Sequence, residues 1–251
     1  MSGHSKWKTN KGKKGIADAK RGATFTKLIK ELVVVARDGG GNPDTNPRLR
    51  AIMQKAKEAN MPSDNVKMAI KRGTGELPGV VYEAVMYEAY GPGGVAILID
   101  SLTDNKNRST AELRNIMSKK GGNMAGAGSV SWMFTQKGYI SVAKDKIKED
   151  ELMNIVLDAG AEDMKHDDNI YEIFTAVQDL EKVKQALQDK GIKWEDAELT
   201  MIPSSTIKVT GHEAKQVLAL VETLEEHDDV QQVYANFDIP DEILDEVAGE
   251  E

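Results

Sequence analysis

The sequence predicts an α+β protein of several domains. We expect a basic N-terminal module of three helices, followed by two α/β-sandwich domains of ferredoxin-like type, one inserted into the other. Charge divides the chain: residues 1–75 carry 17 Lys or Arg and 6 Asp or Glu, whereas residues 76–251 carry 16 and 35, so the net charges of +11 and −19 sum to −8. Apolar residues recur with helical periodicity in the first part, whereas strand-like and helical segments alternate in the second.

Composition excludes several classes of protein. About 40% of the 251 residues are hydrophobic, enough for more than one core, and there is no cysteine. Disulfides, thiolate nucleophiles and zinc–thiolate sites are therefore excluded. The first residues lack the apolar stretch of a secretory signal, and the longest apolar runs, 32–36 and 95–99, are too short to cross a bilayer. We expect a cytoplasmic protein with no membrane partner.

Residues 1–75 predict a basic arm and three helices. His4–Gly15 lacks periodicity and is expected to be extended, and its Trp7 could either stack on a base or anchor the arm to the core. From Ala23 to Gly39 the apolar residues follow a helical stripe, with Lys27, Lys30 and Arg37 on another face.

Capping signals mark the other two helices of this module. Asn46 is an expected N-cap with Pro47 at the first helical position, and a third short helix follows Asn60-Met61-Pro62 and ends at Gly73. The second and third helices resemble a helix-turn-helix only weakly, with Asn65 and Lys67 as its obvious base-reading residues.

The first part of the acidic region predicts a hairpin and a helix. Strands over 80–90 and 95–100 flank the turn 91–94, and a capping box, Ser109-x-x-Glu112, is expected to begin a helix that ends at Lys120. Residues 129–134 are expected to form a further strand. Lys106 and Arg108 could make a second nucleic-acid contact or could simply be exposed to solvent.

The remaining elements predict the insertion. Residues 135–204 read as βαββαβ, which is a ferredoxin-like unit. Residues 205–240 form one further βαβ that cannot cover a sheet alone, so we expect it to join residues 76–134 in one discontinuous domain. The domains are thus 1–75, then 76–134 with 205–240, then the inserted 135–204, with an acidic tail over 241–251.

No catalytic or metal-binding constellation is evident. The histidines at 4, 166, 212 and 227 are scattered, and neither a nucleophile elbow nor a phosphate-binding loop occurs. The glycines of 91–94 and 123–128 do not join a strand to a following helix, as a dinucleotide site requires. We expect no enzyme activity, no cofactor and no metal.

The basic N-terminal module predicts a nucleic-acid interface dominated by phosphate contacts. The alternative is a solvated lysine-rich tail without a ligand. The candidate binding residues are Lys6, Trp7, Lys8, Lys11, Lys13, Lys14, Lys20, Arg21, Lys27, Lys30, Arg48, Arg50, Lys71, Arg72, Lys106 and Arg108.

Several of these segments also resemble the YebC/PmpR family over the whole chain. The resemblance rests on residues 3–7, 18–22 with 25–28, 46–50, 60–62 with 70–73, 90–97, 102–105 and 128–130. Lys8–Gly15 is less like the usual basic run of the family, and Ala23 stands where a lysine is usual.

The resemblance implies three domains with a basic helical first domain, and DNA-binding regulation of transcription. It also implies an alternative, because relatives include a mitochondrial translational activator and members linked to relief of ribosomes stalled on proline-rich chains. The partner is thus DNA, or ribosomal RNA and the ribosome. A third hypothesis is a protein-interaction module that acts through the acidic domains. The sequence leaves the oligomeric state open.

Overall fold

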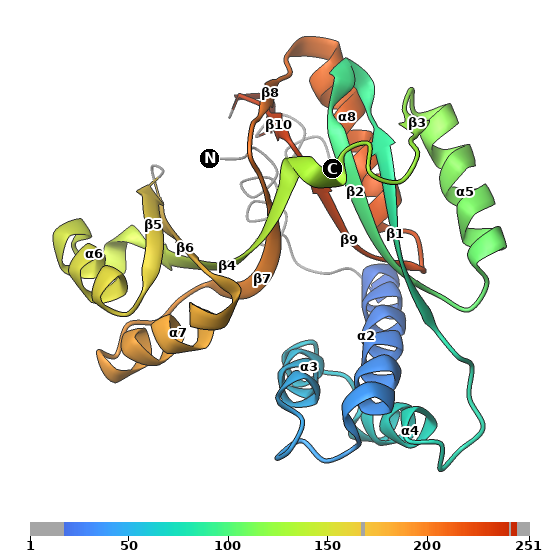
Figure 1. The fold of residues 1–251 in the computed structure, drawn as a ribbon, viewed down its shortest axis with the longest axis horizontal. Helices are drawn as coiled ribbons and strands as arrows, with labels where there is room; N and C mark the ends of the chain where they lie inside the picture. Colours follow the sequence, from blue (N-terminus) through green and yellow to red (C-terminus); the bar gives the residue numbers. More distant parts are fainter. Residues whose placement is uncertain (1–17, 167–168, 241, 245–251) are drawn as a thin grey trace.

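The computed structural model describes residues 18–166, 169–240 and 242–244, which form three lobes (Figure 1). The helices α2, α3 and α4 make one lobe, which we call the head. A four-stranded sheet with α5 and α8 makes the second lobe, the host domain. A second four-stranded sheet with α6 and α7 makes the third, the inserted domain (Figure 1). The predicted fold class is confirmed.

The head consists of α2 (Asp18–Gly39), α3 (Pro47–Glu58) and α4 (Ser63–Gly73). Its core is built on Leu28, Leu32 and Leu49, which are buried between the helices. Both α3 and α4 pack mainly against α2 and only slightly against each other. The α3–α4 pair therefore lacks the mutual packing of a helix-turn-helix unit.

Asn46 connects two helices of the head and confirms the predicted N-cap. Its Oδ1 accepts a hydrogen bond from the Leu49 backbone N–H at 3.1 Å, which caps α3. Its Nδ2 donates to the carbonyls of Val35 at 3.0 Å and Gly40 at 2.9 Å, near the end of α2. One buried amide thus fixes the α2–α3 connection.

The host sheet has the strand order β3-β1-β2-β9. It contains β1 (Glu83–Tyr90), β2 (Ala96–Thr103), β3 (Asn123–Met124) and β9 (Val230–Ala235). The antiparallel pairing of β1 with β2 confirms the predicted hairpin, whose turn contains a 3-10 helix, η1 (Pro92–Gly94). The helices α5 (Lys106–Lys119) and α8 (Gly211–Glu225) pack on one face of this sheet.

The last strand of the predicted 205–240 βαβ unit is divided into two strands, β9 over 230–235 and β10 over 237–238. β9 pairs antiparallel with β2, whereas β10 (Phe237–Asp238) pairs parallel with β8 (Ile207–Lys208). Asn236 lies between them, is completely buried, and accepts the Ala96 backbone N–H at 2.8 Å through its Oδ1. This side chain takes the place of a ladder hydrogen bond, and the strand is interrupted there.

The inserted domain has the strand order β5-β6-β4-β7, with all neighbours antiparallel, as the ferredoxin-like prediction requires. Two helices cover one face of its sheet and enclose a core of their own. The elements in chain order are β4 (Phe134–Ala143), η3 (Lys144–Lys146), α6 (Glu149–Asp158), β5 (Ala161–His166), β6 (Ile170–Thr175), η4 (Val177–Asp179), α7 (Leu180–Asp189) and β7 (Asp196–Pro203).

The chain enters and leaves the inserted domain at the same place. Phe134 and Pro203 are partners in the β4–β7 ladder. Just outside this pair, the Ser204 backbone N–H donates to the Met133 carbonyl at 2.8 Å, and the Ser204 hydroxyl donates to the same oxygen at 3.0 Å. The insertion is therefore attached through two hydrogen-bonded chain segments that lie side by side.

Two further local predictions were wrong. The capping box at Ser109 does not begin α5, because Asn105 caps that helix by accepting the Arg108 N–H at 3.1 Å, and Ser109 lies inside the helix. Residues 129–134 do not form a strand but pass through the 3-10 helix η2 (Ser131–Met133). The reason is that Glu88 accepts the backbone N–H groups of residues 128, 130 and 131, which a strand would have used in a ladder.

Candidate nucleic-acid interface

Most of the predicted basic arm lies outside the described residues. This applies to Lys6, Trp7, Lys8, Lys11, Lys13 and Lys14. The backbone of Lys20 and Arg21 belongs to the first turn of α2. The described helical region, residues 18–75, still carries 12 Lys or Arg against 6 Asp or Glu, which leaves a net charge of +6.

The exposed cations of the head lie on α3 and α4. Arg48, Lys71 and Arg72, all predicted, are exposed to solvent. Lys55 and Lys57, absent from the predicted set, are exposed as well. Lys55 stands seven residues after Arg48, close to two helical turns, so the two side chains share one side of α3. That spacing was the sequence signal that could have added Lys55.

Arg50 is exposed but already hydrogen-bonded. Its guanidinium donates to the Pro43 carbonyl at 3.0 and 3.1 Å and to the Asp44 carbonyl at 3.1 Å. These bonds hold the loop before α3. A phosphate would have to compete with them, so we assign Arg50 to the support of the loop.

The structure corrects the assignment of Lys30 to the phosphate-binding surface. Lys30 is only 7% exposed, and its Nζ lies 2.5 Å from Asp229 Oδ1 and donates to the Asp228 carbonyl at 2.9 Å. Nearby, Lys27 Nζ donates to the Glu225 carbonyl. The polar face of α2 thus packs against the turn between α8 and β9, which periodicity within one helix cannot reveal.

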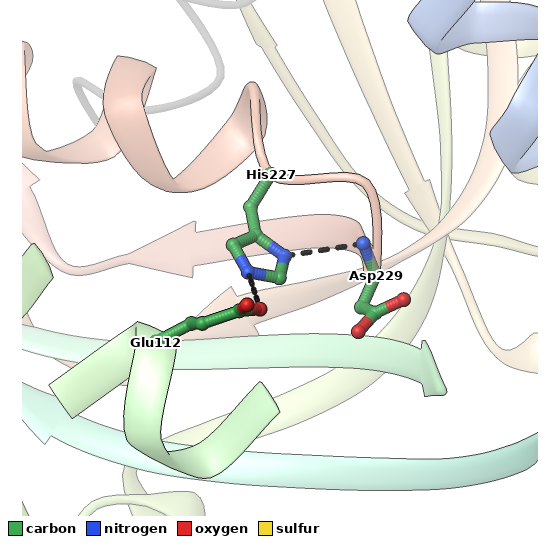
Figure 2. A group of neighbouring side chains, drawn as sticks. All are labelled: Glu112, His227 and Asp229. Atoms are coloured by element: carbon green, nitrogen blue, oxygen red, sulfur yellow. Dashed lines mark hydrogen bonds and ion pairs between the residues drawn. The ribbon is translucent and has the colours of Figure 1, made fainter. Parts of the chain in front are cut away.

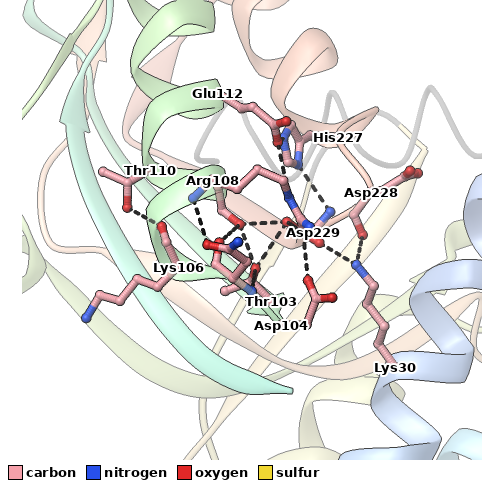
Figure 3. Close-up of polar contacts among 12 residues, drawn as sticks. Lys30, Thr103, Asp104, Lys106, Arg108, Thr110, Glu112, His227, Asp228 and Asp229 are labelled. Carbon is pink, nitrogen blue, oxygen red and sulfur yellow. Dashed lines mark hydrogen bonds and ion pairs between the residues drawn. The ribbon is translucent and has the colours of Figure 1, made fainter. Parts of the chain in front are cut away.

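Asp229 is the centre of a polar junction between the head and the host domain (Figure 3). Besides Lys30, its carboxylate accepts hydrogen bonds from the Ser109 hydroxyl at 2.6 Å, from Arg108 Nη2 at 2.9 Å and from the Thr103 hydroxyl at 3.2 Å. Burial alone would raise the pKa of this carboxyl, but the donors Lys30, Ser109 and Arg108 outweigh burial and hold the pKa well below its ordinary value.

Arg108 and Lys106, the predicted second contact, have different surroundings. Arg108 donates to Asp104 at 2.8 Å as well as to Asp229, so this guanidinium belongs to the junction and the prediction of a free phosphate contact is corrected. The Lys106 side chain is exposed and points away from the junction in Figure 3. Lys106 therefore stays a candidate contact.

One group in the described part of the chain has the residue types of a metal site: Glu112, His227 and Asp229 (Figure 2). They lie at a cavity of about 690 Å³ that is also lined by Lys30 and Arg108. His227 Nδ1 accepts the Asp229 backbone N–H at 3.1 Å, so in the neutral ring Nε2 carries the hydrogen and donates to Glu112 Oε2 at 3.0 Å.

This group does not fit a metal ion well. Both oxygens of Asp229 already accept hydrogen bonds from Lys30, Arg108 and Ser109, and the two cations would repel a metal ion. His227 and Glu112 alone supply fewer ligands than structural or catalytic zinc sites use. We read the three residues as part of the junction. The His227 side chain is only 12% exposed, which fits a place in the junction.

The fold and these sites define a three-domain α+β protein with a cationic helical head and an inserted ferredoxin-like domain. Residues 5–76 match the family described as TACO1/YebC protein N-terminal domain, and residues 82–237 match TACO1/YebC second and third domain. The chain belongs to the TACO1/YebC family, as the resemblance predicted.

Relatives cover nearly the whole chain. The "Probable transcriptional regulatory protein" of Syntrophobacter fumaroxidans is 55% identical over 249 residues, which are 99% of this chain and 100% of that protein. The protein of the same name from Dictyoglomus turgidum is 54% identical over 97% of this chain and 98% of its own length. These names denote regulators and not a class of enzyme.

A solved structure has the same fold. The crystal structure of the conserved hypothetical protein Aq1575 from Aquifex aeolicus is 46% identical, covers 90% of this chain and 94% of its own, and superposes with a TM-score of 0.80. In the described part of the present chain, no helix has both the length and the apolar character needed to cross a membrane.

Proposed function

We propose that this protein is a nucleic-acid-binding regulator of gene expression, and specifically a DNA-binding regulator of transcription. The head, together with the basic arm before it, binds the phosphate backbone. The host and inserted domains carry net negative charge, which disfavours contact with nucleic acid over most of their surface. No catalytic step is assigned to it, and we propose that it acts in the cytoplasm without a membrane.

One observation supports this proposal most directly. Five exposed cations of α3 and α4 take part in no ion pair among residues 18–166, 169–240 and 242–244. Cations on a folded surface that form no ion pair with a carboxylate are available to neutralise phosphates. The five are Arg48, Lys55, Lys57, Lys71 and Arg72.

The choice of DNA rests on the relatives, whose names are those of transcriptional regulators. Phosphate contacts alone do not distinguish DNA from RNA, since only a group that reads the 2′-hydroxyl can do so. An RNA- or ribosome-bound translation factor is therefore the second candidate. An interaction module that acts through the acidic domains is the third.

Two measurements on the full chain separate these candidates. Anisotropy titration of labelled duplex DNA at several salt concentrations should give a log–log slope of roughly −4 to −6, if about five to seven phosphates are neutralised. Cosedimentation with ribosomes tests the second candidate under the same salt conditions. Binding to ribosomes without binding to duplex DNA would favour translation.

The arm supplies a further test. Deletion of residues 1–17 should weaken binding and reduce the salt slope, because it removes five lysines. Interaction with nucleic acid that is independent of salt, or unchanged by the deletion, would contradict the proposal. Retention of a partner by the deleted protein regardless of salt would favour the third candidate.

A further inference from the structure

Trp132 is a large apolar side chain that the fold holds in solvent. It is 73% exposed and lies in η2 between Val130, which is completely buried, and Phe134, which is 6% exposed. These two anchors belong to the core on the second face of the host sheet. The buried neighbours fix the backbone on both sides, so the exposed position of the indole follows from the fold itself. Tryptophan is enriched in binding surfaces relative to the rest of a protein surface.

A second aromatic side chain, Tyr90, is hydrogen-bonded to the same carbonyl group as Trp132. Trp132 Nε1–H donates to the Ser129 carbonyl at 3.1 Å, and the Tyr90 hydroxyl donates to the same oxygen at 3.1 Å. Tyr90 is 38% exposed at the end of β1. One acceptor therefore holds two partly exposed rings beside each other, and their orientation is fixed before any ligand arrives.

The loop that presents this carbonyl is itself held by a carboxylate. Glu88 accepts the backbone N–H of Gly128 at 2.6 Å, of Val130 at 2.6 Å and of Ser131 at 2.9 Å, and it is only 7% exposed. Three charge-assisted hydrogen bonds on one side chain make a rigid loop. Rigid aromatic groups lose little entropy on binding.

Two lysines lie close to the strand that pairs with Tyr90. Tyr90 pairs with Asn123 in the β1–β3 ladder, and Lys119 and Lys120 end α5 just before that strand. Both lysines are exposed, and neither takes part in an ion pair within the described ranges. Their charge favours an anionic partner, and the bases of a nucleic acid can in addition stack on the aromatic rings. Surfaces that bind single-stranded nucleic acid commonly combine aromatic rings, on which bases stack, with cations that bind the phosphates.

We propose that Tyr90 and Trp132 form a stacking platform for unpaired bases of single-stranded nucleic acid, with Lys119 and Lys120 binding the adjacent phosphates. The platform lies on the host domain and is separate from the phosphate-binding cations of the head. It rests on the proposed function, because it supposes that nucleic acid is the partner, and it adds a preference for unpaired bases.

The test measures the affinity of the full chain for a labelled twelve-nucleotide oligouridine and for a labelled duplex DNA of the same length. Trp132→Ala should weaken binding to the single strand about 5- to 150-fold, the range found for loss of one stacked base. Trp132→Phe, which keeps a ring, should stay within about 3-fold of the wild type. Lys119→Gln with Lys120→Gln should reduce the salt slope by about 0.7 for each lysine.

Leu157→Ala is the matched control, because Leu157 is a 46% exposed apolar residue on α6 of the inserted domain. Its affinity for oligouridine should equal that of the wild type. Circular dichroism and thermal unfolding of each variant check that the fold is intact.

The outcomes separate the platform from the proposed function. If the wild type binds both probes and Trp132→Ala binds oligouridine as tightly as the wild type does, the platform is wrong while nucleic-acid binding stands. If the wild type binds only duplex, the platform is likewise wrong. If the wild type binds neither probe, both proposals fall, and Trp132 becomes a candidate contact for another protein.

Discussion

Lys30 Nζ lies 2.5 Å from Asp229 Oδ1, and this buried ion pair joins the head to the host domain. The side chains are 8% and 4% exposed. Lys30 also lies 5.6 Å from the centre of the Tyr82 ring, so its charge has two kinds of partner. The position of the head relative to the host sheet therefore depends on a few groups that are almost entirely shielded from water.

Replacing either Lys30 or Asp229 should destabilise the protein, and the two replacements should differ in the size of their effect. Asp229→Ala leaves the Lys30 ammonium buried without a carboxylate and should lower the free energy of unfolding by about 3–5 kcal/mol. Lys30→Met should cost less, about 1–3 kcal/mol, because Asp229 keeps Arg108 and Ser109 as donors. Urea unfolding measures both.

Lys67→Met is the matched control for Lys30→Met, since its partner Asp64 lies 3.7 Å away and both side chains are more than two-thirds exposed. It should change the free energy of unfolding by less than about 0.5 kcal/mol. An equal change in the free energy of unfolding for Lys30→Met and Lys67→Met would show that the buried junction stabilises the protein no more than an exposed ion pair does.

The lowered pKa of Asp229 predicts a dependence of stability on acid. The folded pKa lies below the unfolded value of about 3.9, so the ionised carboxylate contributes stability that is fully present above that pH and is lost as the pH falls toward the folded pKa. Unfolding of the wild type and of Asp229→Asn between about pH 2 and pH 7 tests this. The difference in the free energy of unfolding between the wild type and Asp229→Asn should shrink below about pH 4. A difference that stays constant with pH would refute the lowered pKa of Asp229.

Gly73 permits α4 to approach α2 closely, which predicts a large effect of one methyl group. A Cβ at this position would collide with the Val33 carbonyl and would lie 2.8 Å from the Ala36 Cβ. Gly73→Ala should therefore destabilise the head by about 1–3 kcal/mol. Gly22→Ala, in open space on α2, should instead be neutral or stabilise by up to about 1 kcal/mol, and thermal unfolding compares the two.

Removing cations from the head should weaken the binding of nucleic acid and should also make that binding less dependent on salt. Replacing Lys71 and Arg72 with Gln should reduce the log–log slope for duplex DNA by up to about 1.8, which is about 0.9 for each phosphate that is no longer neutralised. Lys190→Gln on the inserted domain is the control, because Lys190 is an exposed lysine far along the chain from the head. An unchanged slope for the double variant would place the phosphate-binding residues elsewhere.

Local chemistry made much of the fold predictable. Asn46-Pro47 predicted the start of α3 because a side-chain cap and a missing N–H both act within one turn. The βαββαβ order of the inserted domain followed from alternating patterns and clear stops. These signals depend on residues a few positions apart, which a sequence displays directly.

Interactions between distant residues were not predictable. Lys30 looked like a free cation because its partner Asp229 is 199 residues away. Ser109 looked like a helix cap, but its hydroxyl bonds to that same carboxylate from inside the helix. Glu88 removes the backbone donors of residues 128–131 from any ladder, so a pattern typical of a strand folded as a 3-10 turn. Each error reflects a tertiary interaction that outweighed a local preference.

The hydrogen bond between Ser204 and Met133 bears on how this architecture could arise. Because the two ends of the insertion already touch, a short loop could join them and leave every strand of the surrounding sheet with its present neighbours. The inserted domain between these two residues can therefore be gained or lost without any change in the path of the rest of the chain. Lineages could therefore exchange or enlarge it while the remainder of the molecule keeps its connectivity.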